Sequence, residues 1–181
     1  MHGHAEHEGG LFQLSPYLPL DRTIVAPRGA LETGAGYSWF DINAPRPAAI
    51  NAAADEFADW LARVSDTATS VALLGFSQGG ILAIQVMRRH PELVDAVVML
   101  SGLYDPKPDP GDAALEERKP PLFWGRGTAD ELIPGFGIDL TRDWLVKHTT
   151  LTERIYEDLG HAISDAELDE VNSFLRSHTP G

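Results

Sequence analysis

Short apolar runs that alternate with longer stretches of helical periodicity are the feature that most limits what this chain can fold into. The runs are short and rich in β-branched residues, and the last of them, 151–156, alternates more with polar residues, as expected of a strand nearer the sheet edge. Such runs are typical of strands buried on both faces, as in parallel sheets covered by helices. The pattern therefore predicts a three-layer α/β fold. The predicted strands are 23–27, 71–76, 96–100, 121–124 and 151–156, and the predicted helices are about 45–64, 79–90, 136–148 and 164–177.

Chain length and amino-acid composition favour one globular domain. The 181 residues fit a single domain covering 1–181, and an apolar fraction of 43% suits a full core and excludes a disordered chain. The segment 105–119 differs, because it combines several prolines with acidic residues, and we expect it to be a solvated loop.

Charge and cysteine content exclude several classes of function. Lys and Arg number 14 against 27 Asp and Glu, so the net charge is −13. A surface this acidic repels phosphates, and we expect neither nucleic acid nor an anionic membrane as a partner. The absence of cysteine excludes a thiol nucleophile, a disulfide and a thiolate metal site. The longest apolar runs are too short to span a membrane and the first residues lack signal-peptide features, so we expect a cytoplasmic protein.

A serine stands at the junction between the predicted strand 71–76 and the helix that follows. The sequence of Gly75–Gly80 is GFSQGG, with Ser77 at its centre. A tight strand-to-helix turn would hold the hydroxyl over the sheet edge, and it requires small neighbours such as Gly75 and Gly79. The helix N-terminus would direct free N–H groups toward an oxyanion. The motif also occurs by chance, but this strand-to-helix position predicts that Ser77 is a nucleophile.

An acid and a base follow later strands in the order that a serine hydrolase requires. Asp130 comes just after 121–124, and His161 comes just after 151–156. Ser77, Asp130 and His161 thus have the chain order of the α/β-hydrolases. His161 would accept the serine proton, and Asp130 would fix the imidazole tautomer and stabilise the imidazolium.

Alternative interpretations exist for the acid and the base. Asp130 could instead be an ordinary turn or helix-cap aspartate, and His161 a loop histidine. Asp105, after the preceding strand, is the rival acid, whereas Asp158 is too close to His161 in sequence and fits a surface charge. The other histidines outside the N-terminal segment fit structural positions at helix ends or in the tail; they are His90, His148 and His178.

Motifs in one consistent order cover nearly the whole chain. They are Val25–Gly29, Tyr37–Asp41, Gly75–Gly80, Leu100–Gly102, Phe123–Asp130 and Leu159–His161. Together they resemble the phospholipase/carboxylesterase family of α/β-hydrolases, which includes acyl-protein thioesterases and small bacterial carboxylesterases. The resemblance implies an α/β-hydrolase fold with a mainly parallel sheet and helices on both faces.

The resemblance also implies roles for individual residues. It implies a triad of Ser77, Asp130 and His161, and an oxyanion hole formed by two backbone N–H groups. One belongs to Gln78, and the other to the residue after a His-Gly pair, which here is His4. The positions at which family members line the acyl pocket carry Trp39, Leu103 and Leu132, for which ordinary packing is the alternative.

The chain departs from the family pattern at its start. Family members have an apolar strand before the His-Gly pair, between the strands represented here by 23–27 and 71–76, whereas here the pair follows Met1. Unpaired strand groups would be costly when buried. The two neighbours could close up, a partner chain could fill the gap, or further residues could precede Met1. We expect a sheet shortened at the N-terminus and stabilised in a homo-oligomer.

Three histidines near the start suggest a metal site as a second interpretation. His2, His4 and His7 are accompanied by Glu6 and Glu8. A run of this kind can bind metal, but chain termini are usually poorly ordered. We expect no functional metal.

The predicted function is that of a serine carboxylesterase that hydrolyses short- to medium-chain esters through an acyl-enzyme. The mechanism needs no cofactor, and the expected partner is a small-molecule ester. One alternative is a thioesterase or lysophospholipase that acts on longer acyl chains, since the same triad cleaves either bond. A non-catalytic binding protein with a hydrolase-like fold is the alternative from another class.

Overall fold

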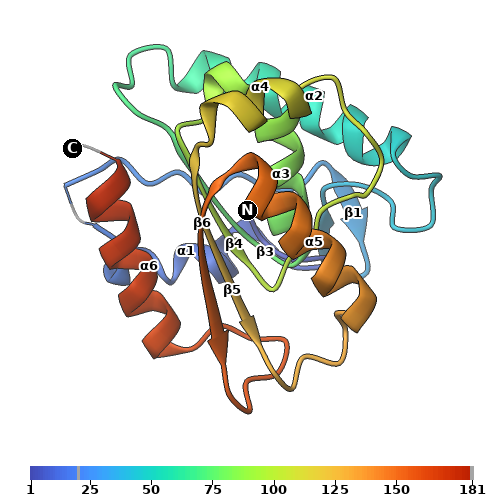
Figure 1. The fold of residues 1–181 in the computed structure, drawn as a ribbon, viewed down its shortest axis with the longest axis vertical. Helices are drawn as coiled ribbons and strands as arrows, with labels where there is room; N and C mark the ends of the chain where they lie inside the picture. Colours follow the sequence, from blue (N-terminus) through green and yellow to red (C-terminus); the bar gives the residue numbers. More distant parts are fainter. Residues whose placement is uncertain (20, 180–181) are drawn as a thin grey trace.

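A four-stranded parallel sheet in the order β3-β4-β5-β6 forms the centre of the molecule (Figure 1). The computed structural model describes residues 1–19 and 21–179. The strands are β3 (Ala72–Phe76), β4 (Ala96–Leu100), β5 (Pro121–Gly127) and β6 (Thr150–Tyr156), and every residue of β4 is buried. Four of the five predicted strands are therefore confirmed.

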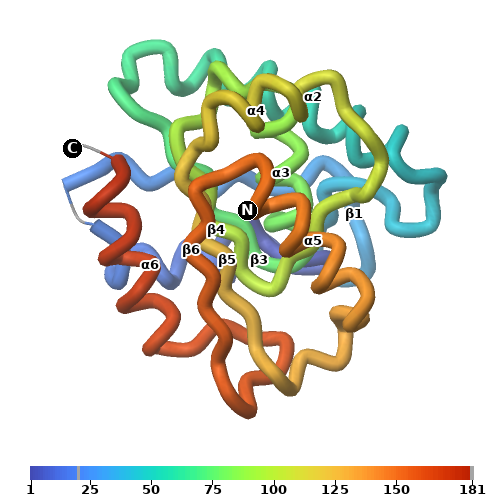
Figure 2. Tube along the Cα trace, in the orientation of Figure 1, coloured from blue at the N-terminus to red at the C-terminus, as the bar shows by residue number. Residues whose placement is uncertain are grey.

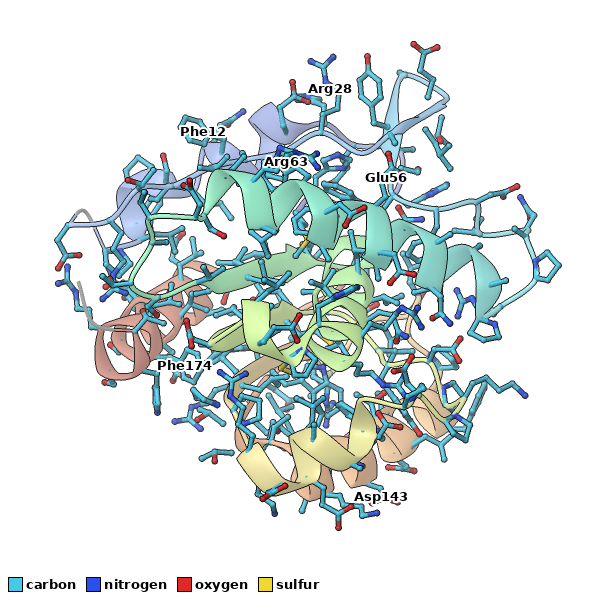
Figure 3. All side chains as sticks on the ribbon, turned by 90° about the horizontal axis from the view of Figure 1, so that it is seen from above. Phe12, Arg28, Glu56, Arg63, Asp143 and Phe174 are labelled. Carbon is cyan, nitrogen blue, oxygen red and sulfur yellow. The ribbon has the colours of Figure 1, made fainter. Side chains whose placement is uncertain are left out.

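Helices cover both faces of the sheet and complete the three predicted layers. Alternate residues of β4 face opposite sides: Val97 and Met99 pack toward α2, α3, α4 and α5, and Val98 and Leu100 toward α6. Figure 1 shows α6 on one side of the sheet and α3 and α5 on the other. From α6, Phe174 (labelled in Figure 3) packs against Phe123 of β5. The helices are α1 (Glu8–Phe12), η1 (Ser15–Tyr17), α2 (Ala48–Val64), α3 (Gln78–Arg89), η2 (Pro91–Leu93), α4 (Asp112–Arg118), α5 (Gly135–His148) and α6 (Asp165–His178).

The strand predicted at 23–27 is wrong. This segment has no ladder partner, and a cavity of about 420 Å³ separates it from β3. The two segments therefore have not closed up. A short antiparallel hairpin follows instead, formed by β1 (Leu31–Thr33) and β2 (Gly36–Ser38), with Gly34 in the left-handed region at the turn.

The start of the chain lies along β3, an edge strand of the sheet; Figure 2 marks the N-terminus in the middle of the view. The Met1 amino group donates to the carbonyl oxygen of Leu74 at 2.6 Å, and the Phe76 N–H donates to the Met1 carbonyl oxygen at 3.1 Å. The first residue therefore pairs with the end of β3 nearest the predicted nucleophile.

The expectation that 105–119 is an entirely solvated loop is also wrong, because α4 lies within it and buries Leu115. The buried Arg88 guanidinium holds this segment. It pairs with Asp112 at 2.8 Å and donates to the carbonyl oxygens of Asp105 and Lys107. The prolines and acidic residues of this segment favour the prediction of a loop, although the segment contains one short amphipathic helix.

Candidate active site

Ser77 lies in a strained turn between β3 and α3. Its φ of 53° and ψ of −117° place it in a region that residues other than glycine rarely adopt. The turn requires glycine on both sides, because a Cβ on Gly75 would overlap the Gly79 carbonyl and a Cβ on Gly79 would overlap the Met1 carbonyl. The Ser77 N–H donates to Leu100 O at 2.8 Å. These contacts hold the serine at the carboxyl end of β3.

His161 and Asp130 form a hydrogen-bonded pair at the same edge of the sheet. His161 Nδ1 lies 2.7 Å from Asp130 Oδ2, and the side chain of Asp130 is 2% exposed. The other oxygen of Asp130 accepts from the Leu132 N–H at 3.1 Å. The imidazole packs on Phe76, with ring centroids 4.9 Å apart. With Nδ1 engaged, Nε2 is the ring nitrogen left for another partner.

Ser77 and His161 line one cavity of about 390 Å³. The structure shows no direct hydrogen bond between their side chains. Catalytic hydrogen bonds of this type are commonly long in the absence of substrate. Both residues are therefore accessible to a molecule that occupies this cavity.

The rival residues have other contacts. Asp105 is buried and accepts from the Lys107 N–H at 3.0 Å. The Asp158 N–H donates to the Thr128 hydroxyl, and no hydrogen bond joins Asp158 to His161.

The other histidines outside the N-terminal segment also have structural partners. His90 pairs with Asp55 at 2.9 Å. The rings of His148 and His178 bond to carbonyl oxygens of their own helices.

Of the two residues expected to supply oxyanion donors, Gln78 directly follows Ser77, and His4 comes three residues after Met1, whose carbonyl oxygen accepts from the Phe76 N–H. Gln78 is the first residue of α3, and its side chain is buried, accepting from the Trp39 N–H at 2.9 Å and donating to Phe40 O at 2.8 Å. The N–H groups that flank His4 are engaged, those of Gly3 with Glu6 and Ala5 with Ser38. Within the described residues, the N–H groups of Gln78 and His4 have no partner.

The structure brings two of the three expected pocket residues to the cavity. Leu103 and Leu132 line it, whereas Trp39 lies in the core, 8% exposed, with its indole donating to the His2 carbonyl at 2.8 Å. Sequence reasoning missed several lining residues. Those that the apolar positions of 133–140 could have indicated are Ile133, Phe136 and Leu140, and those without such a signal are Arg46, Ser101 and Tyr104.

The N-terminal histidines do not converge on one point. The buried His2 ring accepts from the Gly29 N–H at 3.0 Å, and burial lowers its pKa. His4 contacts the Ser38 hydroxyl, and His7 precedes α1. Within 1–19 and 21–179, no group of three or more His, Asp or Glu side chains is placed to hold a metal ion.

The first turn of α6 contains a buried acid, Glu167. The Ser164 hydroxyl caps the helix by accepting from the Glu167 N–H at 3.2 Å, as the sequence predicts. The Glu167 carboxylate lies against Gly125 of β5 and has no hydrogen-bond partner among the described residues. Burial raises the pKa of this carboxyl group to about 7.

A family model matches this chain across most of its length. Residues 20–179 match the model described as phospholipase/carboxylesterase. The chain belongs to this family.

Named relatives in the family are moderately similar. Esterase YpfH of Escherichia coli is 27% identical over 92% of this chain and 74% of its own length. Acyl-protein thioesterase 1 of Saccharomyces cerevisiae is 25% identical over 94% of this chain and 78% of its own length. Carboxylesterase SOBER1 of Arabidopsis thaliana is 26% identical over 62% of this chain, which spans only 50% of that protein.

Solved structures confirm the α/β-hydrolase fold. Esterase PE8 superposes with a TM-score of 0.77 at 28% identity, covering 98% of this chain and 89% of its own. The Bacillus cereus carboxylesterase gives 0.85 at 14% identity, covering 98% and 86%, a likeness of fold alone. Within the described residues, no helix is both long and apolar enough to cross a membrane.

Proposed function

We propose that this family member is a serine carboxylesterase that acts through an acyl-enzyme. The main supporting observation is the 2.7 Å contact between His161 Nδ1 and Asp130 Oδ2. His161 lines the same cavity as Ser77, which lies in its strained turn. A hydroxyl on a fixed turn, an imidazole and a buried carboxylate are the set that nucleophilic ester cleavage requires. The relatives named esterase and carboxylesterase support the same reaction class.

The proposed reaction has two steps. Ser77 Oγ attacks the ester carbonyl carbon as Nε2 of His161 takes its proton, and the N–H groups of Gln78 and His4 stabilise the oxyanion. The C–O bond to the alcohol then breaks, and His161 gives its proton to the leaving oxygen. In the second step His161 deprotonates a water, which attacks the carbonyl carbon of the acyl-enzyme. The bond from that carbon to Ser77 Oγ then breaks, and His161 gives the proton to Oγ, which releases the acid and restores Ser77. Asp130 holds the imidazole throughout, and no cofactor takes part.

The cavity favours a short or medium acyl group. Its volume of about 390 Å³ lies near the lower end of the range for small-molecule sites, and its lining is mostly apolar. Acyl thioester hydrolysis is a second candidate function, favoured by the similarity to a yeast acyl-protein thioesterase. The exposed apolar side chains of Leu132 and Phe136 at the cavity support it, since a longer chain could extend over them.

A fluorophosphonate probe tests whether Ser77 is the nucleophile. We expect stoichiometric labelling of the wild-type protein and none of Ser77→Ala. The matched control is Ser173→Ala, which removes an exposed hydroxyl on α6 and keeps the label. Folded but unlabelled wild-type protein would instead indicate a non-catalytic binder. A series of p-nitrophenyl esters from acetate to dodecanoate, assayed beside acyl-CoA, then separates the carboxylesterase from the thioesterase.

A further inference from the structure

One charged side chain stands out in the lining of the Ser77 cavity. Most of the lining is apolar, with Leu103, Ile133 and Phe136 among its members. Arg46, just before α2, is the only permanently charged residue among the described lining residues. Arg46 is exposed and lines the same cavity as Ser77, so its side chain is available to a ligand that enters the cavity.

Arg46 is also unusual among the arginines of this acidic chain. Most of them are neutralised by carboxylates, such as Arg89 by Asp55 at 2.7 Å and Arg142 by Glu153 at 2.7 Å. Within the described residues, Arg46 forms no ion pair and no side-chain hydrogen bond. In the part of the chain that the structure describes, the other arginines without a carboxylate partner are Arg63 and Arg176, and neither lines this cavity.

The side chain of Arg46 is exposed, and the cavity lining offers its charge no carboxylate partner among the described residues. No carboxylate is among the described lining residues, and the nearby Asp130 is committed to His161 and the Leu132 N–H. The helix α2 begins two residues after Arg46 and has no acidic residue in its first turn. The positive end of the α2 dipole therefore adds to the potential of the guanidinium.

We propose that Arg46 binds an anionic group on the substrate, a carboxylate or a phosphate carried by the ester, while the apolar part of that ester packs on the 103–104 and 133–140 side of the cavity. The inference rests on the proposed function and names its substrate class. A guanidinium suits this role because its parallel N–H donors match two oxygens of a carboxylate or phosphate. It would also offset the repulsion that a chain of net charge −13 exerts on an anionic ester.

The test compares a charged ester with its neutral analogue. Mono-p-nitrophenyl glutarate carries a free carboxylate, and its methyl ester is the matched neutral substrate. The measured quantity is the kcat/KM of the charged ester divided by that of the neutral one. We expect Arg46→Ala to lower this ratio about tenfold, mainly through KM, because the charge is lost in both ground and transition states. Arg46→Lys retains a charge without the bidentate geometry and should give an intermediate ratio.

A matched control and a salt series accompany this test. Arg63→Ala removes an unpaired arginine of α2 that does not line the cavity (Arg63 is labelled in Figure 3). This variant should leave the ratio unchanged. Raising the salt to 0.5 M, where the Debye length is about 4 Å, should lower the ratio in the wild type and not in Arg46→Ala.

A second substrate set distinguishes the source of the anion and its side of the ester. 4-Acetoxybenzoate and 4-acetoxyphenyl phosphate place a carboxylate or a phosphate on the leaving group, and methyl 4-acetoxybenzoate is the neutral reference. The anion whose ratio depends on Arg46 identifies the preferred group. The inference is overturned if Arg46→Ala changes charged and neutral esters alike in every set, or if Arg63→Ala shifts the ratio as much. It is separable from the proposed function, which fails only if the neutral esters are not cleaved in a Ser77-dependent way.

Discussion

The imidazole of His161 packs against Phe76, the residue directly before Ser77, with ring centroids 4.9 Å apart and planes inclined by 45°. The proposed base is thus supported by the turn that carries the proposed nucleophile. Phe76 is buried, and on the same face of the sheet it belongs to the core that includes Leu100 and Val171. Side-chain packing and hydrogen bonding to Asp130 together restrict the ring.

Replacing Phe76 should reduce turnover more than it reduces stability. Phe76→Leu keeps most of the buried volume and removes the flat surface on which the imidazole rests, so we expect a fall in kcat of about three- to tenfold with a stability loss of about 1.5 kcal/mol or less. Steady-state kinetics and urea unfolding measure the two effects. An unchanged kcat would show that Asp130 alone orients the ring. The matched control is Phe123→Leu, on the same face but against Phe174, which should alter stability and leave kcat unchanged.

Removing the charge of Asp130 should nearly abolish turnover. Asp130→Asn keeps the shape but stabilises the wrong imidazole tautomer, and we expect kcat to fall by about 10³- to 10⁴-fold. The control is Asp105→Asn, a change in the rival acid whose carboxylate bonds to the Lys107 N–H. Activity that survives in Asp130→Asn but is lost in Asp105→Asn would reverse the assignment of the acid.

The glycine at position 79 should be intolerant of even one added carbon. In Gly79→Ala the new Cβ would overlap the backbone carbonyl of Met1, so the turn or the chain start must shift. We expect a loss of about 2 kcal/mol or more in the free energy of unfolding. Gly10→Ala is the control, because its Cβ would meet nothing within 4 Å and alanine favours the helix there. Equal stabilities of the two variants would contradict the close packing described for the turn.

Glu167 should make the protein less stable as pH rises through the acid-to-neutral range. Its folded-state pKa is raised from 4.5 to about 7 by burial, so the folded protein binds more protons than the unfolded chain between these values. The cost is absent below about pH 4.5, increases up to pH 7 and is complete above it, where it reaches about 3 kcal/mol.

Glu167→Gln isolates this effect because it removes the titration and keeps the shape. Urea unfolding at pH 5 and pH 8 should show the variant gaining stability relative to the wild type by about 2 to 3 kcal/mol between the two values. Groups that titrate in both proteins cancel in this comparison. A difference that is independent of pH would show that the carboxylate is ionised at both values.

The sequence predicts the structure correctly where the hydrophobic pattern of a segment agrees with the place of that segment in the fold. The runs at 71–76, 96–100, 121–124 and 151–156 are strands because each has a neighbour to bond. The placement of Asp130 and His161 after successive parallel strands was enough to expect them at one sheet edge. Their 2.7 Å separation agrees with that expectation.

The sequence-based predictions failed where a segment's structure depends on contacts with residues far away in the chain. The segment 23–27 has the composition of a strand, but it pairs with no strand of the described structure. Strand formation depends on a neighbouring strand, and the local sequence does not show whether one is present. The helix α4 is stabilised by the buried Arg88, which lies well before it in the chain. Arg46, Ser101 and Tyr104 reach the cavity from segments that are far apart in the sequence, and this leaves no periodic signal.

The two oxygens of Asp130 connect parts of the site with different roles. One oxygen holds the imidazole, and the other accepts from the backbone of Leu132, at the start of the segment whose apolar side chains line the cavity. A chain that fills the apolar side and displaces this segment would therefore pull on the same carboxylate that aligns the proton acceptor. If Asp130 is the acid of the proposed triad, we expect esters that fit the cavity poorly to lose turnover as well as affinity.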